Sequence, residues 1–245
     1  MGTIRCDYPD VEAFVDAKRA AGSLTNFNMS VLVSDAFMEA VDADTDWDLV
    51  FEDKVYRTLR ARDLWDKIMR STYEHAEPGV IFIDRINARN NLHYCETIQS
   101  TNPCGEQPLP PYGACLLGSI NLARLIRDPF TEGAHLDREA LAELTATAVR
   151  MMDNVVDLSQ FPLDQQQAEA AAKRRIGLGV TGLADAFLMC RVRYGSAESV
   201  RLTEDWLTEL RDAAYRASIM LAAEKGAFPK FEPEPYLDGE MIRRL

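Results

Sequence analysis

Three side chains with complementary chemistry lie at alternate positions in one short segment of the chain. Asn102, Cys104 and Glu106 bring an amide, a thiol and a carboxyl group close together. In an extended backbone, residues two apart point to the same side, so the three groups would converge. The amide can orient a ligand, the thiol can attack or hold an unpaired electron, and the carboxyl group can transfer a proton. The alternative is a structural loop with a buried, inert cysteine.

The segment around these residues must be a loop. Residues 97–118 contain four prolines and three glycines together with Cys104 and Cys115. Proline removes a backbone donor and fixes φ, which excludes a continuous helix or a central strand. Because Cys, Leu and Tyr recur in the segment, we expect an ordered loop that enters the interior.

Regular elements on both sides must position this loop. Apolar spacing predicts helices over residues 11–20, 35–41, 57–75, 137–158, 182–190 and 200–226. Short apolar runs predict strands over residues 28–33, 80–83 and 176–180. Alternating strands and helices indicate an α/β architecture, and no internal repeat or low-complexity linker marks a domain boundary.

Composition limits the classes to which the protein can belong. With 245 residues and 47% hydrophobic content, the chain is long enough to bury a core. Its net charge of −12 argues against a nucleic-acid-binding surface, although a local basic pocket could still take a small anion. The five cysteines are scattered and follow no signal-peptide pattern, so we expect a cytoplasmic protein. No apolar stretch approaches the ~18 residues of a membrane helix, so no membrane contact is expected.

The loop and its surroundings resemble one enzyme family. The segment NPCGEQ, followed by PYGACLLGSINLARL, is similar to the active-site finger loop of adenosylcobalamin-dependent (class II) ribonucleotide reductases. Other segments resemble the family in the same order, namely GTIRCDYPDVEAFVDAK, LTNFNMSV, GVIFIDRIN and RRIGLGVTGLADAF. The similarity therefore covers nearly the whole chain. Class II is favoured over class I because Pro103 and Gly105 flank Cys104 and because Cys115 follows closely.

The resemblance implies a fold and an incomplete enzyme. Residues 1–245 would be a fragment of the catalytic barrel domain, a partial ten-stranded α/β barrel with a central finger loop at about 97–118. The remaining segments of the reductase would complete it, as a homodimer in the full enzyme. We therefore expect the polypeptide by itself not to be a competent reductase. A noncatalytic relic or assembly module of a reductase is the alternative.

The resemblance also implies roles for the loop residues. Cys104 would become a thiyl radical through adenosylcobalamin and abstract the 3′-hydrogen of a ribonucleotide substrate. Glu106 would take the 3′-OH proton, and Asn102 would hydrogen-bond the sugar hydroxyls. Pro103 and Gly105 would border the substrate. The sequence does not indicate whether the substrate is a diphosphate or a triphosphate.

Loss of the 2′-OH as water needs two electrons, which the resemblance implies come from a pair of cysteines. Cys115 matches one member of that pair, and a thioredoxin-like or glutaredoxin-like reductant would restore it. The other member is not assigned to any residue. For Cys6, Cys95 and Cys190 we expect buried or half-buried packing.

A second loop resembles the family's specificity loop, which passes information from a deoxynucleoside triphosphate effector to the substrate base. It covers residues 18–28 and contains the candidate binding residues Lys18, Arg19, Gly22, Ser23 and Asn26. The glycine would make the loop mobile, and the two cations could meet phosphate or a base edge. The alternative is a solvated helix end with its basic residues favourably near the C-terminus.

Two further patterns indicate weaker hypotheses. Gly177, Gly179 and Gly182 fit the G-x-G-x-x-G string of a dinucleotide-dependent oxidoreductase, but a clear second strand with the expected acidic residue is missing. Close strand-to-helix packing is the preferred interpretation of these glycines. No metal site is expected, because the cysteines and histidines lack the C-x-x-C spacing of structural zinc.

Overall fold

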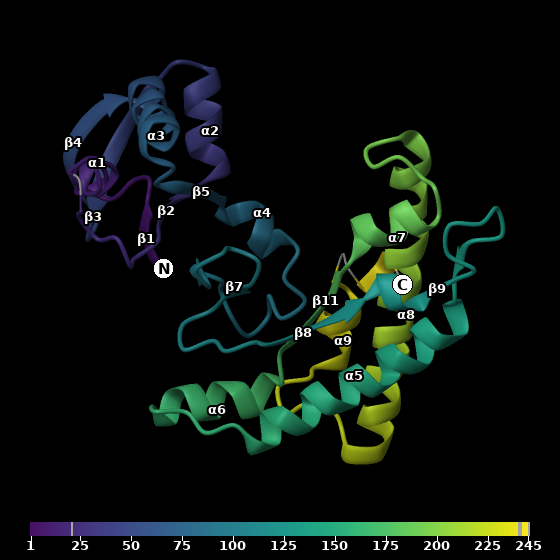
Figure 1. The fold of residues 1–245 in the computed structure, drawn as a ribbon. Coiled ribbons are helices and arrows are strands. Elements are labelled where there is room, and N and C mark those ends of the chain that lie inside the picture. The colour runs from purple at the N-terminus through teal and green to yellow at the C-terminus, as the bar shows by residue number, and fades with distance from the viewer. Residues whose placement is uncertain (21, 240–241, 245) are drawn as a thin grey trace. The chain divides into compact units, whose positions relative to one another are not determined.

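The structure, a computed structural model, describes residues 1–20, 22–239 and 242–244. The chain forms two compact units, the first made of Met1–Pro111 with Pro233–Arg244 and the second of Tyr112–Glu232 (Figure 1). The boundary falls inside the predicted loop 97–118, although no domain boundary was expected from the sequence.

A three-stranded parallel sheet organises the first unit. It consists of β1 (Gly2–Arg5), β2 (Met29–Val33) and β5 (Gly79–Phe82), in the order β1-β2-β5. All five residues of β2 are buried, as expected for the middle strand of a parallel sheet that is covered on both faces. The strands predicted over 28–33 and 80–83 are confirmed to within one residue.

The described residues of the first unit form five α-helices, three of which contribute to its core. The helices are α1 (Val11–Asp16), α2 (Asp35–Asp42), α3 (Ala61–His75), α4 (Ile83–Ala88) and α9 (Pro233–Leu237), followed by a 3-10 turn at Ile242–Arg244. The core combines Val11, Val15, Phe37, Leu64 and Ile68 with the valines of β2. α2 begins where the Ser34 hydroxyl accepts the N–H of Phe37 at 3.1 Å, which is a standard helix cap.

One predicted helix begins too early. Residues 57–60, expected in the helix 57–75, instead close β4 (Lys54–Arg60), which pairs antiparallel with β3 (Asp46–Phe51). Glu52 and Asp53, with φ of 49° and 60°, form the two-residue turn that suits a tight hairpin. The prediction failed because pairing with the preceding strand in a hairpin overrides the local apolar spacing.

The second unit has a two-stranded parallel sheet and long helices. The sheet pairs β8 (Leu116–Asn121) with β11 (Ile176–Thr181). The helices are α5 (Arg138–Leu158), α6 (Asp164–Lys173), α7 (Leu183–Met189) and α8 (Ala197–Lys225). A 3-10 turn at Leu122–Leu125 and the short pair β9 (Ile126–Arg127) and β10 (His135–Leu136) complete the unit. The predicted elements of this half are confirmed to within three residues, whereas α6, β8, β9 and β10 were not predicted.

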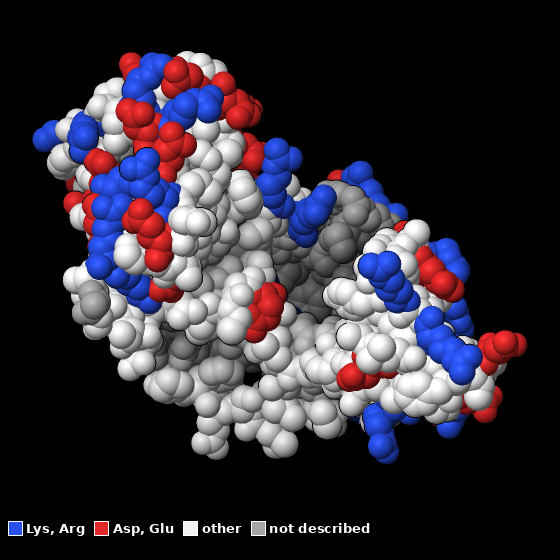
Figure 2. All heavy atoms as spheres, turned by 45° about the horizontal axis from the view of Figure 1, so that its top comes forward, with Lys and Arg blue, Asp and Glu red and all other residues white. Residues whose placement is uncertain are grey.

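The observed sheets leave the barrel prediction open. The described residues form one three-stranded and four two-stranded sheets, and no closed barrel is present among them. The mixed α/β class is confirmed, and the partial ten-stranded barrel stays a prediction. Within the described ranges no helix is both long and apolar enough to cross a membrane. Figure 2 shows basic and acidic side chains mixed over the visible face.

Candidate active site

The predicted loop contains a short β-hairpin in the first unit. β6 (Ser100–Thr101) pairs antiparallel with β7 (Pro108–Leu109). The backbone N–H of Asn102 donates to the carbonyl oxygen of Gln107 at 3.2 Å, which extends the pairing by one step. Residues 102–107 therefore form the tip of a hairpin.

The tip turns at Gly105. Its φ is +81°, and its N–H donates to the carbonyl oxygen of Asn102 at 3.0 Å. An added Cβ would meet no atom within 4 Å, so backbone conformation, and not space, favours glycine here. The extended backbone assumed from the residue spacing is wrong, because the tip is a turn.

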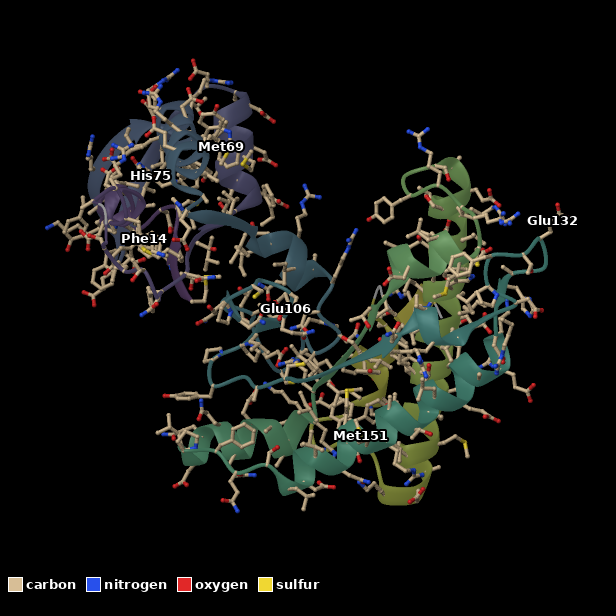
Figure 3. All side chains as sticks on the ribbon, viewed as in Figure 1. Phe14, Met69, His75, Glu106, Glu132 and Met151 are labelled. Atoms are coloured by element: carbon tan, nitrogen blue, oxygen red, sulfur yellow. The ribbon has the colours of Figure 1, made fainter. Side chains whose placement is uncertain are left out.

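The turn nevertheless brings the amide and the carboxylate together. Nδ2 of Asn102 donates to Oε1 of Glu106, which Figure 3 labels at this loop. Oδ1 of Asn102 accepts the backbone N–H of Gln107 at 2.9 Å. Both ends of the amide are thus held, and one N–H of Nδ2 points at the carboxylate that would act as a base.

The thiol between them is accessible. Cys104, Gly105 and Glu106 are all exposed, so the expectation that this loop enters the interior is wrong for these residues. The physical reason is that the polar groups of Asn102 are satisfied within the tip. Asn102 pairs its backbone and side chain within residues 102–107, and no interior partner is required.

A groove of about 620 Å³ adjoins the tip within the same unit. Its lining includes Cys104, Gly105 and Pro103 from the hairpin, and Asn28 and Glu77 from other segments. Apolar wall residues come from β2 and β5, namely Met29, Val80, Ile81 and Phe82. Apolar walls with a few convergent polar groups, and a volume in the usual range of about 300–1,000 Å³, are typical of a small-molecule site.

The two cationic side chains of the predicted specificity loop form ion pairs. Lys18 forms an ion pair with Glu77, and Nε of Arg19 lies 3.1 Å from Oδ1 of Asp16. Gly22, Ser23 and Asn26 lie in consecutive turns, and Ala21 between the two parts lies outside the described residues. The structure therefore shows both cations paired with carboxylates of the protein itself.

One residue that the sequence did not single out connects this loop to the hairpin tip. Nδ2 of Asn28 donates to the carbonyl oxygen of Pro103 at 2.9 Å. Pro103 immediately precedes Cys104, so the last residue of the loop contacts the segment that carries the thiol. The residue type offered no signal for this contact, which joins segments 75 positions apart.

Cys115 belongs to the second unit, directly before β8. It is half-buried and lines a cavity of about 230 Å³ together with Val156, Phe161 and Arg175. Burial raises the pKa of its thiol to about 11, although the Arg175 guanidinium acts in the opposite direction. The thiol therefore keeps its proton at neutral pH, which suits a group that gives up a hydrogen in a reaction.

The remaining cysteines and the glycine string behave as packing residues. Cys6 is buried and Cys95 and Cys190 are half-buried, which confirms the packing expected for them. Gly182 precedes α7 with φ of +68°, and a Cβ there would run into the side chain of Asn121. This supports the interpretation of close strand-to-helix packing. Over the described ranges, no three His, Cys, Asp or Glu side chains gather as metal ligands.

A comparison with known protein families gives a match over nearly the whole chain. The model of the ribonucleotide reductase barrel domain matches residues 1–244. The chain belongs to this family.

Sequence identity to curated ribonucleotide reductases supports this assignment. The chain is 39% identical over 232 residues to the vitamin B12-dependent ribonucleoside-diphosphate reductase of Thermoplasma acidophilum, covering 94% of the chain and 30% of that protein. It is 40% identical over 234 residues to the protein of the same name from Mycobacterium tuberculosis (strain CDC 1551 / Oshkosh), covering 94% and 33%. With the ribonucleoside-diphosphate reductase subunit alpha of Chlamydia muridarum, identity is 34% over 186 residues, covering 74% and 17%. The chain thus spans about a third of the length of the B12-dependent relatives.

Proposed function

We propose that the chain is a catalytic segment of an adenosylcobalamin-dependent ribonucleotide reductase and that Cys104 carries its thiyl radical. The observation that carries the proposal is the hydrogen bond between Asn102 and Glu106 beside the exposed thiol, on a hairpin tip that borders a groove. The B12-dependent relatives support the cofactor, and their names support a ribonucleoside diphosphate as substrate.

The first step uses the three residues of the tip. As a thiyl radical, Cys104 takes the hydrogen atom from C3′ of the ribose, forming an S–H bond and leaving the unpaired electron on carbon. Glu106 accepts the proton of the 3′-OH. The N–H that Asn102 gives to Glu106 holds the carboxylate in place, and its second N–H remains for a sugar hydroxyl.

The second step removes the 2′-OH as water. Two thiols supply the two electrons and two hydrogens and become a disulfide, and Cys104 then returns its hydrogen atom to C3′, which restores the thiyl radical. Cys115 is one of the two, supported by a thiol that stays protonated at neutral pH. Its partner is not assigned, and a thioredoxin-like or glutaredoxin-like protein would reduce the disulfide again.

The tip fits the approach of a large cofactor. Cys104 is exposed and the space beside Gly105 is open, so a cofactor can approach the thiol from outside the groove. Cys104 is the residue that would face adenosylcobalamin, and no other residue of the chain is assigned to hold it. When bound, the cofactor supplies the radical by homolysis, and the protein supplies position and exclusion of water.

The resemblance supports further parts of the proposal. A deoxynucleoside triphosphate effector would act through the loop 18–28, using Lys18, Arg19, Gly22, Ser23 and Asn26. The remaining segments of the reductase would complete the barrel around the tip, in a homodimer that works in the cytoplasm. By itself the 245-residue chain would not convert ribonucleotides into deoxyribonucleotides.

Reconstitution tests the proposal. The chain is combined with the segments of a B12-dependent relative that precede and follow the matched region, and deoxynucleotide formation from ribonucleoside diphosphates is measured with adenosylcobalamin and a dithiol. The mixture should form product, and Cys104→Ser should abolish it. Cys190→Ser is the matched control, because this half-buried thiol lies in the other unit, and it should leave activity intact. Equal activity of Cys104→Ser and wild type would contradict the proposal.

A further inference from the structure

The two ends of the loop 18–28 meet on a single carboxylate. One oxygen of Glu77, Oε2, pairs with the ammonium group of Lys18 at the start of the loop. The other, Oε1, accepts the backbone N–H of Met29, directly after the loop, at 3.2 Å. The side chains of Lys18 and Glu77 are 14% and 24% exposed, so this pair is better shielded from solvent than a typical surface ion pair.

Glu77 is itself held by the framework of the first unit. The hydroxyl of Ser71, in α3, lies 3.1 Å from the carbonyl oxygens of both Glu77 and Val15, and Ser71 is 1% exposed. The next residue, Pro78, accepts a hydrogen bond from the Thr72 hydroxyl at 2.6 Å. The carboxylate therefore projects from a segment tied to α1 and α3, which makes it a rigid point of attachment.

The same end of the loop contacts the radical cysteine's segment. Asn28, adjacent to Met29, donates its side-chain N–H to the carbonyl oxygen of Pro103 at 2.9 Å. Glu77, Asn28 and Cys104 line the same groove. A continuous series of contacts thus runs from Lys18 through Glu77 and the end of the loop to the residue before Cys104.

We infer that Glu77 and Asn28 are positioning residues of the reductase. Glu77 clamps both ends of the specificity loop, and Asn28 transmits the position of the loop to the hairpin tip. Lys18 accordingly acts on the loop's shape through its ion pair with Glu77. This inference rests on the proposed function for its catalytic meaning, whereas the clamp itself is a property of the chain.

The clamp is tested on the 245-residue chain by hydrogen exchange of backbone amides. Glu77→Gln keeps an acceptor for Met29 but removes the charge partner of Lys18, and exchange within residues 22–28 should become about fivefold faster. Lys18→Met should do the same from the other side, and Lys18→Arg should restore slow exchange. Glu74→Gln is the matched control, because it removes one negative charge from an exposed position of α3. Thermal unfolding verifies that each variant folds.

The link to the tip is tested in the same way. Asn28→Asp keeps the size of the side chain but removes the donor to Pro103, and exchange within residues 102–107 should become about tenfold faster. Exchange unchanged in this range, or Glu77→Gln behaving like Glu74→Gln, would overturn the inference. If Glu77→Gln does not fold, the pair Lys18→Met and Lys18→Arg decides the same question.

The reconstituted enzyme gives an independent measurement. The ratio of turnover with and without a deoxynucleoside triphosphate should fall about fivefold in Glu77→Gln and in Asn28→Asp, and stay unchanged in Glu74→Gln. An unaltered ratio in both variants would refute transmission through these residues. A wild-type mixture that forms no deoxynucleotide would count against the proposed function, and the exchange experiments would still decide the clamp.

Discussion

Cys104 and Cys115 are close in sequence but lie in different surroundings. Cys104 is exposed on a six-residue hairpin tip whose neighbouring amide and carboxylate are hydrogen-bonded to each other. Cys115 is half-buried at the start of β8, against Val156 and Phe161, where burial raises the pKa of its thiol to about 11. One sulfur is accessible beside a carboxylate, and the other is half-buried and kept protonated by desolvation.

The difference in exposure and in neighbouring groups suits the two thiols to different chemistry. A radical site needs access and an oriented proton acceptor, which a turn with internal hydrogen bonds supplies. A thiol that donates hydrogen needs to remain protonated until the reaction demands it, which desolvation achieves. Each half of this contrast can be tested separately.

The largest effect is expected at Glu106, the proposed proton acceptor in the hairpin tip. Glu106→Gln keeps an oxygen that can accept from Asn102 but removes the proton acceptor, so turnover of the reconstituted enzyme should fall by about 10²–10⁴-fold. Glu132→Gln, in an exposed loop of the second unit (Figure 3), is the matched control and should retain full turnover. Turnover within a fewfold of wild type in Glu106→Gln would remove the carboxylate from the mechanism.

An intermediate effect is expected at Cys115. At pH 8 a thiol with a pKa of about 11 is mostly protonated, so alkylation by iodoacetamide should be roughly 100-fold slower than for an ordinary exposed thiol. The rate should keep rising with pH towards 11. Arg175→Met should slow it further, because the guanidinium favours the thiolate. Mass spectrometry of the labelled peptides separates Cys115 from Cys104, and equal rates at pH 8 would erase the contrast between them.

The smallest effect concerns the ion pairs beside the Cys115 cavity. Arg174 donates to Asp153 at 2.8 Å and to Asp157 at 2.5 Å, and Lys225 from α8 reaches the same two carboxylates. Hydrogen bonds from Arg174 and then Lys225 lower the pKa of Asp157 to about 2. Because Asp157 is half-exposed, Asp157→Asn should cost at most about 1 kcal/mol of unfolding free energy at pH 7.

The pH dependence of that cost follows from the direction of the shift. A carboxyl group whose folded pKa lies below its ordinary value stabilises the fold above about pH 4, and this contribution is lost as the pH falls towards 2. Urea unfolding at pH 7 and at pH 2.5 measures the difference between variant and wild type. Asp205→Asn, in a loose pair on α8, should be neutral at both pH values. If Asp157→Asn changed the unfolding free energy equally at pH 7 and at pH 2.5, the ion pairs would not be the cause of the change.

Local sequence rules predicted much of the framework. The long helices α5 and α8 follow from apolar residues at helical spacing over many turns, and β5 and β11 follow from short apolar runs. The same rules failed at residues 57–60. There the chain pairs with β3, the preceding strand of the same hairpin, and this pairing outweighs the helical spacing that continues into α3.

The arrangement of the candidate site was also only partly predictable from the sequence. The composition of residues 97–118 indicated a loop, and Asn102 and Glu106 were correctly expected to converge, although through a turn at Gly105 and not an extended backbone. The exposure of Cys104 and the engagement of Lys18 by Glu77 were not foreseen. Both depend on which distant segments the folded chain brings together.

By itself, the sequence determined the residue types of the site, the proline- and glycine-rich loop that carries them, the longer helices and three of the strands, because these depend on covalent geometry and on periodicity within a few turns. The tertiary structure alone decided that one carboxylate holds both ends of the loop 18–28, that Asn28 bonds to the residue before Cys104, and that the thiol of Cys115 is desolvated. Those properties arise from contacts between residues far apart in the chain, and the identity of either residue does not specify its partner.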